Sequence, residues 1–402
     1  MTIRRYRLNV FLLSTSQALF FISAVTMITF GGLVGKMLAD DKSLATLPVA
    51  LYVVGSMLST VPASFIMRRI GRRGGFLIGA SAGIISGALA AYAIFEGSFW
   101  LFGLSAFIGG IYQAHTQYYR FAATEAAPGE YAARAISLVL AGGVVSALFG
   151  PWIAVSTRDL LAPVPFAGAY ATASVISLVA FAVISFLRIP KTEVDTESGG
   201  GRPLLEIIRQ PVFMAASLSA AMSYGLMVLV MTSTPLAMEA CGFSIEATGG
   251  VIQGHVLAMF VPSFFSGWLI GRLGVLRVLY SGMAMFVIGA VIAVSGIDFA
   301  NFFITLVLVG VGWNFLFVGG TTLLGEAYRP EEKAKVQGFN ELIVSVSSAT
   351  ASFSSGALMN TSGWNFVNYG MVPFLLITFM ATVWYGRNLK RAKHAAIDAT
   401  SI

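Results

Sequence analysis

The sequence has little charge and almost no cysteine. Only 11% of its 402 residues are charged, whereas soluble proteins carry about a quarter. Because 57% of the residues are hydrophobic, a chain of this length can bury its apolar surface only in lipid. The single cysteine, Cys241, excludes an intrachain disulfide. We therefore expect a multi-pass protein of the lipid bilayer.

Several chemical motifs are also missing. The three histidines lie far apart and predict no metal cluster, and without a P-loop segment we do not expect ATP hydrolysis. The segment "GASAG" (residues 79–83) fits a hydrolase nucleophile motif. It lies in an apolar span with a glycine at every fourth residue, which predicts a helix-packing face instead. Basic residues fall in short groups between apolar stretches and not on one polar face, so we expect no nucleic acid partner. Catalytic groups do not cluster in the sequence, so we expect no enzyme activity; we also expect no cofactor.

The chain is instead rich in long apolar stretches. A helix needs about 20 mostly apolar residues to cross the hydrocarbon core. The polar stretch 188–210 separates six such spans from six more. We predict an all-α membrane protein with two six-helix bundles (1–187 and 211–388), a cytoplasmic linker (188–210) and a cytoplasmic tail (389–402). The predicted spans are 9–34, 45–67, 75–95, 99–124, 133–156, 164–187, 211–237, 247–270, 276–296, 300–326, 338–358 and 365–386.

Positive charges indicate the orientation of these spans. With the N-terminus inside, 21 of the 25 lysines and arginines fall in cytoplasmic segments. Lys36, Lys42 and Arg158 fall outside, and Arg120 lies within a span. This asymmetry follows the positive-inside rule, so both termini are predicted to be cytoplasmic.

The two halves of the sequence resemble each other. "VPASFIMRRIGRR" begins at residue 61 and "VPSFFSGWLIGRLGVLR" at residue 261, and both place Arg-x-Gly after Val-Pro. "TEAAPGEYAAR" (124–134) aligns with "GEAYRPEEKAK" (325–335). Parallel repeats of this kind are typical of transporters that work by alternating access about a midplane site.

Twelve spans, a central linker and the "RRIGRR" loop resemble the major facilitator superfamily over the whole chain. The resemblance implies a bacterial inner-membrane transporter of a small molecule, and we expect a monomer. The loop motif of the family carries an acid where this sequence has Arg68. That acid helps to hold the inward gate near the start of the eleventh helix, where this chain has Glu341. We therefore expect a reversed pair of Arg68 with Glu341.

Further charges at the cytoplasmic ends predict a gate. Glu125 and Glu326 occupy equivalent positions in the repeat, and we expect salt bridges to Arg69 and Arg272; proton carriage is the alternative role for these acids. The complete predicted gate comprises Arg68, Arg69, Arg72, Glu125, Arg134, Arg272, Glu326, Lys335 and Glu341.

Two motifs bear on transport direction. The fifth span contains "AGGVVSALFGPW", which partly matches the spaced glycines of antiporters in the family. A helix kinked by proline and packed closely through small residues is the favoured interpretation, and an antiporter motif is the alternative. Proton-coupled exporters of the family carry an arginine on the fourth helix, at the position of Ala106 here. This substitution disfavours proton-driven export.

The fourth span carries a polar stripe. At 100° per residue, Gln113, Gln117, Arg120 and Thr124 share one helix face, and His115 lies on the opposite side. Arg120 admits two roles: a structural one in a gate network, or a forked contact to a carboxylate, phosphate or carbonyl pair of a substrate. His255 is either a packing residue or a site residue able to take a proton. The predicted substrate-binding residues are Gln17, Gln113, Gln117, Arg120, Tyr224, Gln253, His255 and Asn314.

A mostly uncharged site of amides and aromatics suits a polar, planar metabolite. The stretches "QYYRFAA" and "GWNFLFVGGTTLL" resemble bacterial superfamily members that take up riboflavin, which makes riboflavin import the best named expectation. Multidrug or metabolite efflux by proton antiport is the alternative. Protons are a candidate coupling ion, carried by His255, Glu125 or the substrate; uniport and exchange are the alternatives. A channel, a sensor or a membrane enzyme is disfavoured by the repeat and by the lack of clustered catalytic groups.

Overall fold

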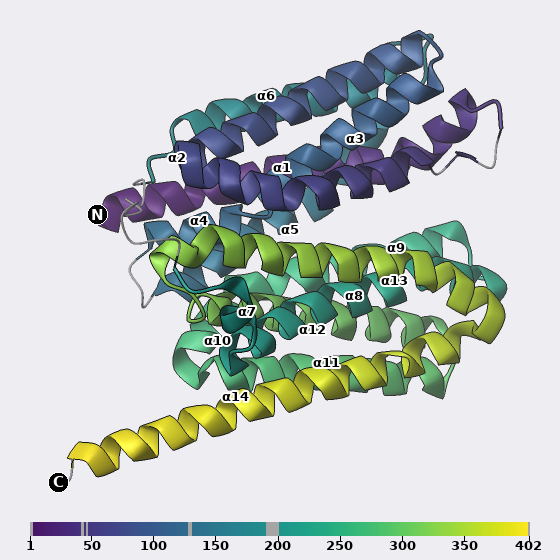
Figure 1. Ribbon diagram of the computed structural model, residues 1–402. Coiled ribbons are helices and arrows are strands. Elements are labelled where there is room, and N and C mark those ends of the chain that lie inside the picture. The colour runs from purple at the N-terminus through teal and green to yellow at the C-terminus, as the bar shows by residue number, and fades with distance from the viewer. Residues whose placement is uncertain (1–2, 42–43, 46, 128–130, 190–200, 401–402) are drawn as a thin grey trace. The chain divides into compact units, whose positions relative to one another are not determined.

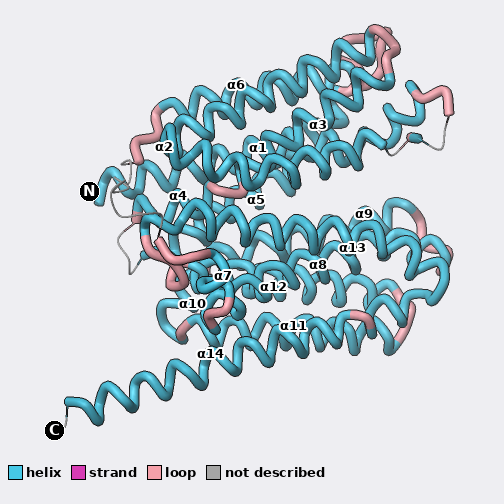
Figure 2. Tube along the Cα trace, in the orientation of Figure 1, coloured by secondary structure: helices cyan, strands magenta, loops and turns pink. Residues whose placement is uncertain are grey.

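The computed structural model describes residues 3–41, 44–45, 47–127, 131–189 and 201–400. Within these ranges the regular structure is entirely helical (Figure 2). The chain divides into two compact units. The first contains residues 1–194 together with 337–342, and the second contains residues 195–336 and 343–402. Residues 190–200 of the predicted linker lie outside the described part.

The first unit is built from six helices (Figure 1). They are α1 (Ile3–Leu38), α2 (Leu47–Phe95), α3 (Phe99–Thr116), α4 (Tyr119–Ala126), α5 (Ala132–Thr157) and α6 (Ala167–Ser185). Helix α2 packs against α3 and α6, and α1 packs against α5 and α6. The unit therefore buries its apolar side chains between pairs of long helices.

The second unit contains the remaining elements. They are α7 (Leu204–Ile208), α8 (Pro211–Ala240), α9 (Ile245–Phe260), the 3₁₀ turn η3 (Val261–Phe264), α10 (Ser266–Leu273), α11 (Val275–Ser295), α12 (Phe299–Leu324), η4 (Pro330–Glu332), α13 (Lys333–Tyr369) and α14 (Met371–Thr400). Helix α12 packs against α8, α9 and α11, which places it at the centre of this unit. Residues 337–342 of α13 are the part that groups with the first unit.

Glycines allow α2 to approach its neighbours closely. A Cβ atom at Gly79 would lie 2.5 Å from the Cβ of His115, and one at Gly83 would lie 2.4 Å from the Tyr112 ring. One at Gly87 would lie 2.6 Å from a backbone nitrogen of α6. The glycine repeat containing "GASAG" is thus a packing face, as its spacing predicts.

The internal repeat is visible in the backbone. Gly71 interrupts α2 with φ 86° and ψ 165°, and Gly274 separates α10 from α11 with φ 85° and ψ 151°. Both glycines follow the Arg-x pair of the repeated loop. A positive φ is costly for other residues, so each half needs glycine at this turn.

Fewer described helices meet a criterion of length and hydropathy for crossing a membrane than the twelve spans that the sequence predicts. Eight described helices are long and apolar enough to cross a bilayer, and nine if the bent pair formed by residues 247–264 and 266–273 counts as one span. Helix α2 is counted once although it contains the predicted spans 45–67 and 75–95 on either side of Gly71. The count of twelve and the orientation of the termini remain predictions.

Candidate functional site

The fourth predicted span is broken inside its polar stripe. Helix α3 ends at Thr116 and α4 begins at Tyr119, so Gln117 and Tyr118 form a turn between them. The Tyr118 amide donates to the carbonyl of His115, three residues back, over 3.2 Å. Despite the break, Arg120 Nη1 donates to Gln117 Oε1 over 3.2 Å. The predicted neighbours within the stripe therefore do meet.

Arg120 forms a deeply buried ion pair. Its Nη2 lies 2.5 Å from Oε1 of Glu341, and the side chains are 3% and 2% exposed. The same carboxylate oxygen accepts from Asn340 Nδ2 over 2.8 Å. The Arg120 guanidinium also lies over the Phe121 ring, 4.7 Å from its centroid. Glu341 belongs to the segment 337–342, which groups with the first unit. Arg120, the one cation within a predicted span, is therefore paired with a carboxylate 221 positions away in the sequence.

A second arginine network lies close by. Arg72 Nε and Nη2 both donate to Oε1 of Glu125, over 3.0 and 2.6 Å, and Nε also donates to Oε2. Arg72 Nη2 donates to Gln337 Oε1 over 2.5 Å. The guanidinium lies 5.6 Å from the centroid of the Tyr118 ring, and the Tyr118 hydroxyl donates to the Thr60 carbonyl. Charge-assisted, forked contacts of this kind are the stronger class of hydrogen bond.

These pairings differ from the expected ones. Glu341 pairs with Arg120 rather than with Arg68, and Glu125 pairs with Arg72 rather than with Arg69. The reason is the turn at Gly71, beyond which Arg72 is buried, whereas Arg68 and Arg69 are exposed.

In the second unit, the predicted gate residues have other partners. Glu326 accepts a hydrogen bond from the Tyr385 hydroxyl over 2.9 Å. The Arg272 guanidinium lies 5.2 Å from the centroid of the Trp268 ring. Among the described residues, the expected salt bridge between Glu326 and Arg272 is not formed. Lys335 Nζ donates to the carbonyl of Arg202. Arg134, in the first unit, is exposed.

One buried carboxylate of the second unit, Glu332, was not predicted from the sequence. Glu332 in η4 is fully buried and accepts from Nε, Nη2 and the backbone amide of Arg202 over 2.7–2.8 Å, and from the Arg329 amide over 2.9 Å. Its hydrogen bonds with Arg202 hold the pKa of the carboxyl at about 2. A signal was available, because Pro330-Glu-Glu directly before a helix is typical of a capped N-terminus.

The other predicted substrate-binding residues are divided between the units. Gln17 is buried in α1, and Gln113 is half-buried in α3. In the second unit, Gln253 is exposed, while His255 is buried and its Nδ1 lies 2.7 Å from the Leu306 carbonyl. Tyr224 packs edge-on against the rings of Trp313 and Phe317. Each of these residues keeps its predicted role as a hypothesis.

Asn314 stabilises a helix break. Its Nδ2 donates to the Met259 carbonyl over 2.7 Å and to Ser263 Oγ over 2.6 Å. Helix α9 ends at Phe260, so the carbonyls of its last turn lack helical partners. The Asn314 amide supplies a donor there, which is a structural use of this side chain.

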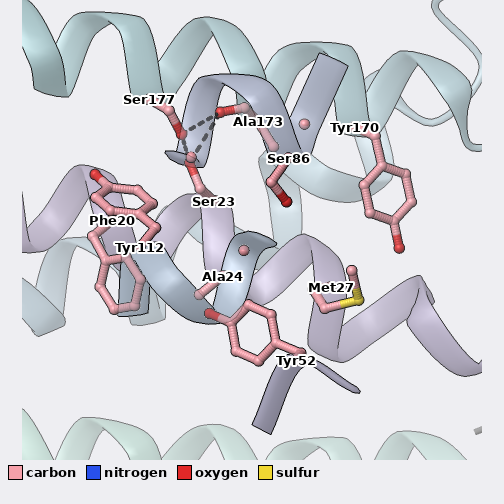
Figure 3. Close-up of a pocket in the computed structure, with 13 residues that line it drawn as sticks. Phe20, Ser23, Ala24, Met27, Tyr52, Ser86, Tyr112, Tyr170, Ala173 and Ser177 are labelled. Atoms are coloured by element: carbon pink, nitrogen blue, oxygen red, sulfur yellow. Dashed lines mark hydrogen bonds between the residues drawn. The ribbon is translucent and has the colours of Figure 1, made fainter. Parts of the chain in front are cut away.

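A small cavity lies within the first unit (Figure 3). It has a volume of about 40 Å³, enough for a few water molecules and far below the ~300 Å³ of a metabolite pocket. Ser23 and Ser177 both donate to the Ala173 carbonyl at its wall. The buried hydroxyl of Tyr170 has no hydrogen-bond partner among the described atoms. The cavity suits ordered water and is too small for an organic substrate.

The fold and these buried charges define a class: a helical membrane protein with an internal repeat and buried arginine–carboxylate pairs. Comparison with known proteins identifies the family. A sequence model of the Major Facilitator Superfamily matches residues 10–262 and 235–400. The chain belongs to this superfamily and is a secondary transporter.

Two relatives found by sequence comparison support this assignment. The chain is 41% identical over 379 residues to the riboflavin transporter RfnT of Brucella anthropi, covering 94% of this chain and 95% of that protein. It is 27% identical over 387 residues to the uncharacterized MFS-type transporter YddS of Bacillus subtilis, covering 90% and 87%.

Among solved structures, the transporter FucP in the outward conformation aligns with a TM-score of 0.78 and 14% identity, over 95% of this chain and 99% of that chain. The human organic anion transporter MFSD10 aligns with a TM-score of 0.73 and 13% identity, over 94% and 99%. At this identity the structural likeness establishes the fold alone.

Proposed function

We propose that this chain imports riboflavin across the bacterial inner membrane by alternating access. The observation that carries the proposal is the 41% identity to a riboflavin transporter over 94% of the chain. Such similarity along almost the whole length leaves no large segment in which a different activity would reside. The protein acts on its substrate by moving it and not by a chemical reaction, so it is not an enzyme.

The side chains of the proposed site match the chemistry of riboflavin. The flavin ring is planar and aromatic, with two carbonyls and ring nitrogens that accept hydrogen bonds, and the ribityl chain carries hydroxyls. Amide side chains such as Gln17, Gln113 and Gln117 both donate and accept. An arginine fork such as that of Arg120 suits paired acceptors and stacks on planar rings. In the second unit, Tyr224, Gln253, His255 and Asn314 are the proposed contributors.

We also propose twelve membrane crossings with both termini in the cytoplasm and a monomeric transporter. The support is the asymmetry of the basic residues, 21 of which fall in the predicted inward segments. Cysteine accessibility labelling tests the topology: single cysteines introduced at Lys36 and at Arg277 in a Cys241→Ser background should react with an impermeant reagent from opposite sides of the membrane. Reaction from the same side would contradict the proposed topology.

Transport itself is tested in proteoliposomes. Vesicles that contain the purified protein should take up labelled riboflavin, and unlabelled riboflavin in excess should suppress the uptake. Empty vesicles and the heat-denatured protein serve as controls. A protein that neither exchanges riboflavin across the membrane nor binds it, as judged by flavin fluorescence, would overturn the proposal. Energy-dependent expulsion of riboflavin or of unrelated drugs would favour the alternative, efflux by proton antiport.

A further inference from the structure

The cavity shown in Figure 3 lies between four helices of the first unit. Its lining residues come from α1, α2, α3 and α6. From α1 they are Phe20, Ser23, Ala24 and Met27, whose spacing places them on one helix face. Protein interiors are close-packed and contain few voids larger than a water molecule. The packing of α1 against its neighbours is therefore interrupted along this face.

Serine side chains supply hydrogen-bond acceptors at the cavity wall. Ser23 and Ser177 donate to the Ala173 carbonyl over 3.2 and 2.9 Å. Ser86 donates to the Ser105 carbonyl over 2.7 Å. Each hydroxyl has one proton, which is thus used within the protein, while the oxygen atom keeps lone pairs that can accept. A molecule bound in the cavity can therefore donate hydrogen bonds to these oxygens.

Tyr170 adds a hydroxyl whose proton is not used within the protein. The side chain lines the cavity from α6, is 3% exposed, and packs edge-on against Phe102. Its hydroxyl has no hydrogen-bond partner among the described atoms, although buried polar groups in proteins usually have one. The hydroxyl requires an acceptor, and the serine oxygens can take donors. A water molecule supplies both.

The size and polarity of the cavity favour water over other ligands. About 40 Å³ holds about three water molecules, because one water needs about 10–15 Å³ of such space. A monovalent cation is disfavoured, because the described lining residues include no carboxylate and an unpaired buried charge is costly. An organic molecule is too large. Water is therefore the ligand that fits this wall.

The second unit has an aromatic cluster at the equivalent place. Extending the alignment of the two halves along the helix makes Trp313 the counterpart of Tyr112 in the cavity wall. Phe20 packs edge-on against Tyr112 with ring centroids 5.0 Å apart. Tyr224 packs in the same way against the fully buried Trp313, at 5.2 Å. The smaller tyrosine side chain leaves space in the first unit where an indole lies in the second.

The cavity adjoins helix segments that carry two proposed substrate-binding residues. Phe20 follows Gln17 by three residues on α1, and Tyr112 directly precedes Gln113 on α3. Close-packed side chains resist compression, whereas ordered water rearranges at low cost. A shift of α1 toward the cavity therefore moves the backbone that carries Gln17 and requires only water to rearrange.

We propose that the cavity is an internal water site and that its water is a deformable contact between α1 and α6 during transport. The water accepts a hydrogen bond from the Tyr170 hydroxyl and donates to the serine oxygens. When α1 shifts between the states of the transport cycle, the water rearranges in place of side chains. The role in transport rests on the proposed riboflavin uptake, whereas the water site itself does not.

Radiolytic footprinting of the purified protein detects buried water directly. X-ray irradiation converts bound water to hydroxyl radicals, which oxidise the side chains beside it. The reporters are Tyr170 and Met27, which line the cavity. The controls are Tyr118 and Met238, which are buried and do not line it. The reporters should be oxidised at least about five times faster than the controls, as expected for side chains in contact with ordered water.

A larger side chain at the wall tests the role of the water. Ala173→Val adds two methyl groups at the cavity, so it should displace water, lower the oxidation of Tyr170 to that of the Tyr118 control and raise the midpoint of unfolding. The lost deformable contact should lower the maximal rate of riboflavin uptake at least about threefold, as stabilising changes do where activity needs movement.

A matched variant excludes a general effect of valine in a helix. Ala182→Val makes the same change at an exposed position of α6, so it should leave oxidation, unfolding and uptake unchanged. If Ala173→Val does not fold, Ala24→Val fills the cavity from α1 and is judged by the same measurements.

The outcomes are distinguishable. Reporters oxidised no faster than the controls would overturn the water site. A midpoint of unfolding that rises in sodium chloride but not in choline chloride would also overturn it and indicate a monovalent cation. An unchanged maximal uptake rate in Ala173→Val, with the oxidation of Tyr170 lost, would overturn the role in transport. Absence of riboflavin binding and uptake in the unmodified protein would overturn the proposed function and that role, while footprinting would still decide the water site.

Discussion

Truncation of Arg120 should destabilise the protein by an amount that depends on pH. Arg120→Ala removes the cation that neutralises Glu341, while the carboxylate stays buried and still accepts from the Asn340 amide. An unpaired buried charge costs about 3–5 kcal/mol, but the carboxyl can avoid this cost by taking up a proton. For a carboxyl whose ordinary pKa is 4.5, protonation costs about 1.4 kcal/mol per pH unit above that value.

The loss of stability caused by Arg120→Ala therefore has an upper limit, and this limit becomes smaller as the pH is lowered. At pH 7 the limit is about 3 kcal/mol, and at pH 5.5 it is about 1 kcal/mol. The double variant Arg120→Ala with Glu341→Gln contains no buried charge, so its stability should not follow this pH dependence. As a control, Arg158→Ala removes an exposed pair whose side chains are 47% and 58% exposed, and it should leave the stability nearly unchanged at both pH values.

The assay is reversible unfolding of the purified protein in mixed detergent and SDS micelles at both pH values. Stability differences are measured between the single variant, the double variant and the unmodified protein. A loss caused by Arg120→Ala that is equal at pH 7 and pH 5.5 would refute the reasoning, because it would attribute the loss to packing of the arginine and not to an unpaired carboxylate.

Three further changes test other parts of the structure. Arg120→Lys keeps the charge but loses the fork, so riboflavin affinity measured by flavin fluorescence should weaken about tenfold or more; unchanged affinity and transport would exclude a forked substrate contact. Glu332, whose pKa of about 2 lies below the ordinary 4.5, should stabilise the protein above pH 4.5 by about 1–3 kcal/mol, less than the full shift because Arg202 is partly exposed. This contribution should disappear between pH 4.5 and pH 2 in unfolding measurements, and a Glu332→Gln variant should lack it; an identical acid profile in that variant would contradict the pair. Gly110→Ala places a Cβ 2.2 Å from a backbone carbonyl of α2 and should cost about 1–3 kcal/mol in the same measurement, whereas Gly32→Ala, which meets nothing within 4 Å, should be neutral or slightly stabilising; equal effects would refute the close-packing argument.

The helices and their small-residue packing could be predicted because they depend on local pattern. An apolar run long enough to cross lipid must satisfy its backbone internally, so it forms a helix in almost any context. The spacing of Gly79, Gly83 and Gly87 likewise places them on one face before any neighbour is known. The repeated Arg-x-Gly loops predicted equivalent turns, and Gly71 and Gly274 adopt almost the same positive φ.

The charge pairs could not be predicted from the same patterns. Periodicity indicates that Arg120 shares a face with Gln117, but it does not indicate which distant segment covers that face. The family resemblance suggested Arg68 for Glu341, and one turn at Gly71 buries Arg72 and exposes Arg68. Glu332 was not predicted as a functional or structural site because its role depends on hydrogen bonds with Arg202, which is 130 positions away in the sequence.

The amino-acid sequence by itself determined that this protein is helical, membrane-embedded and repeated, because hydrophobicity, glycine spacing and charge asymmetry act over one or two helical turns or sum over whole segments. Only the tertiary structure decided which carboxylate neutralises Arg120. A buried arginine needs a partner that neutralises its charge, because water cannot do so. Which residue becomes that partner depends on the packing of two segments that lie 221 residues apart in the sequence.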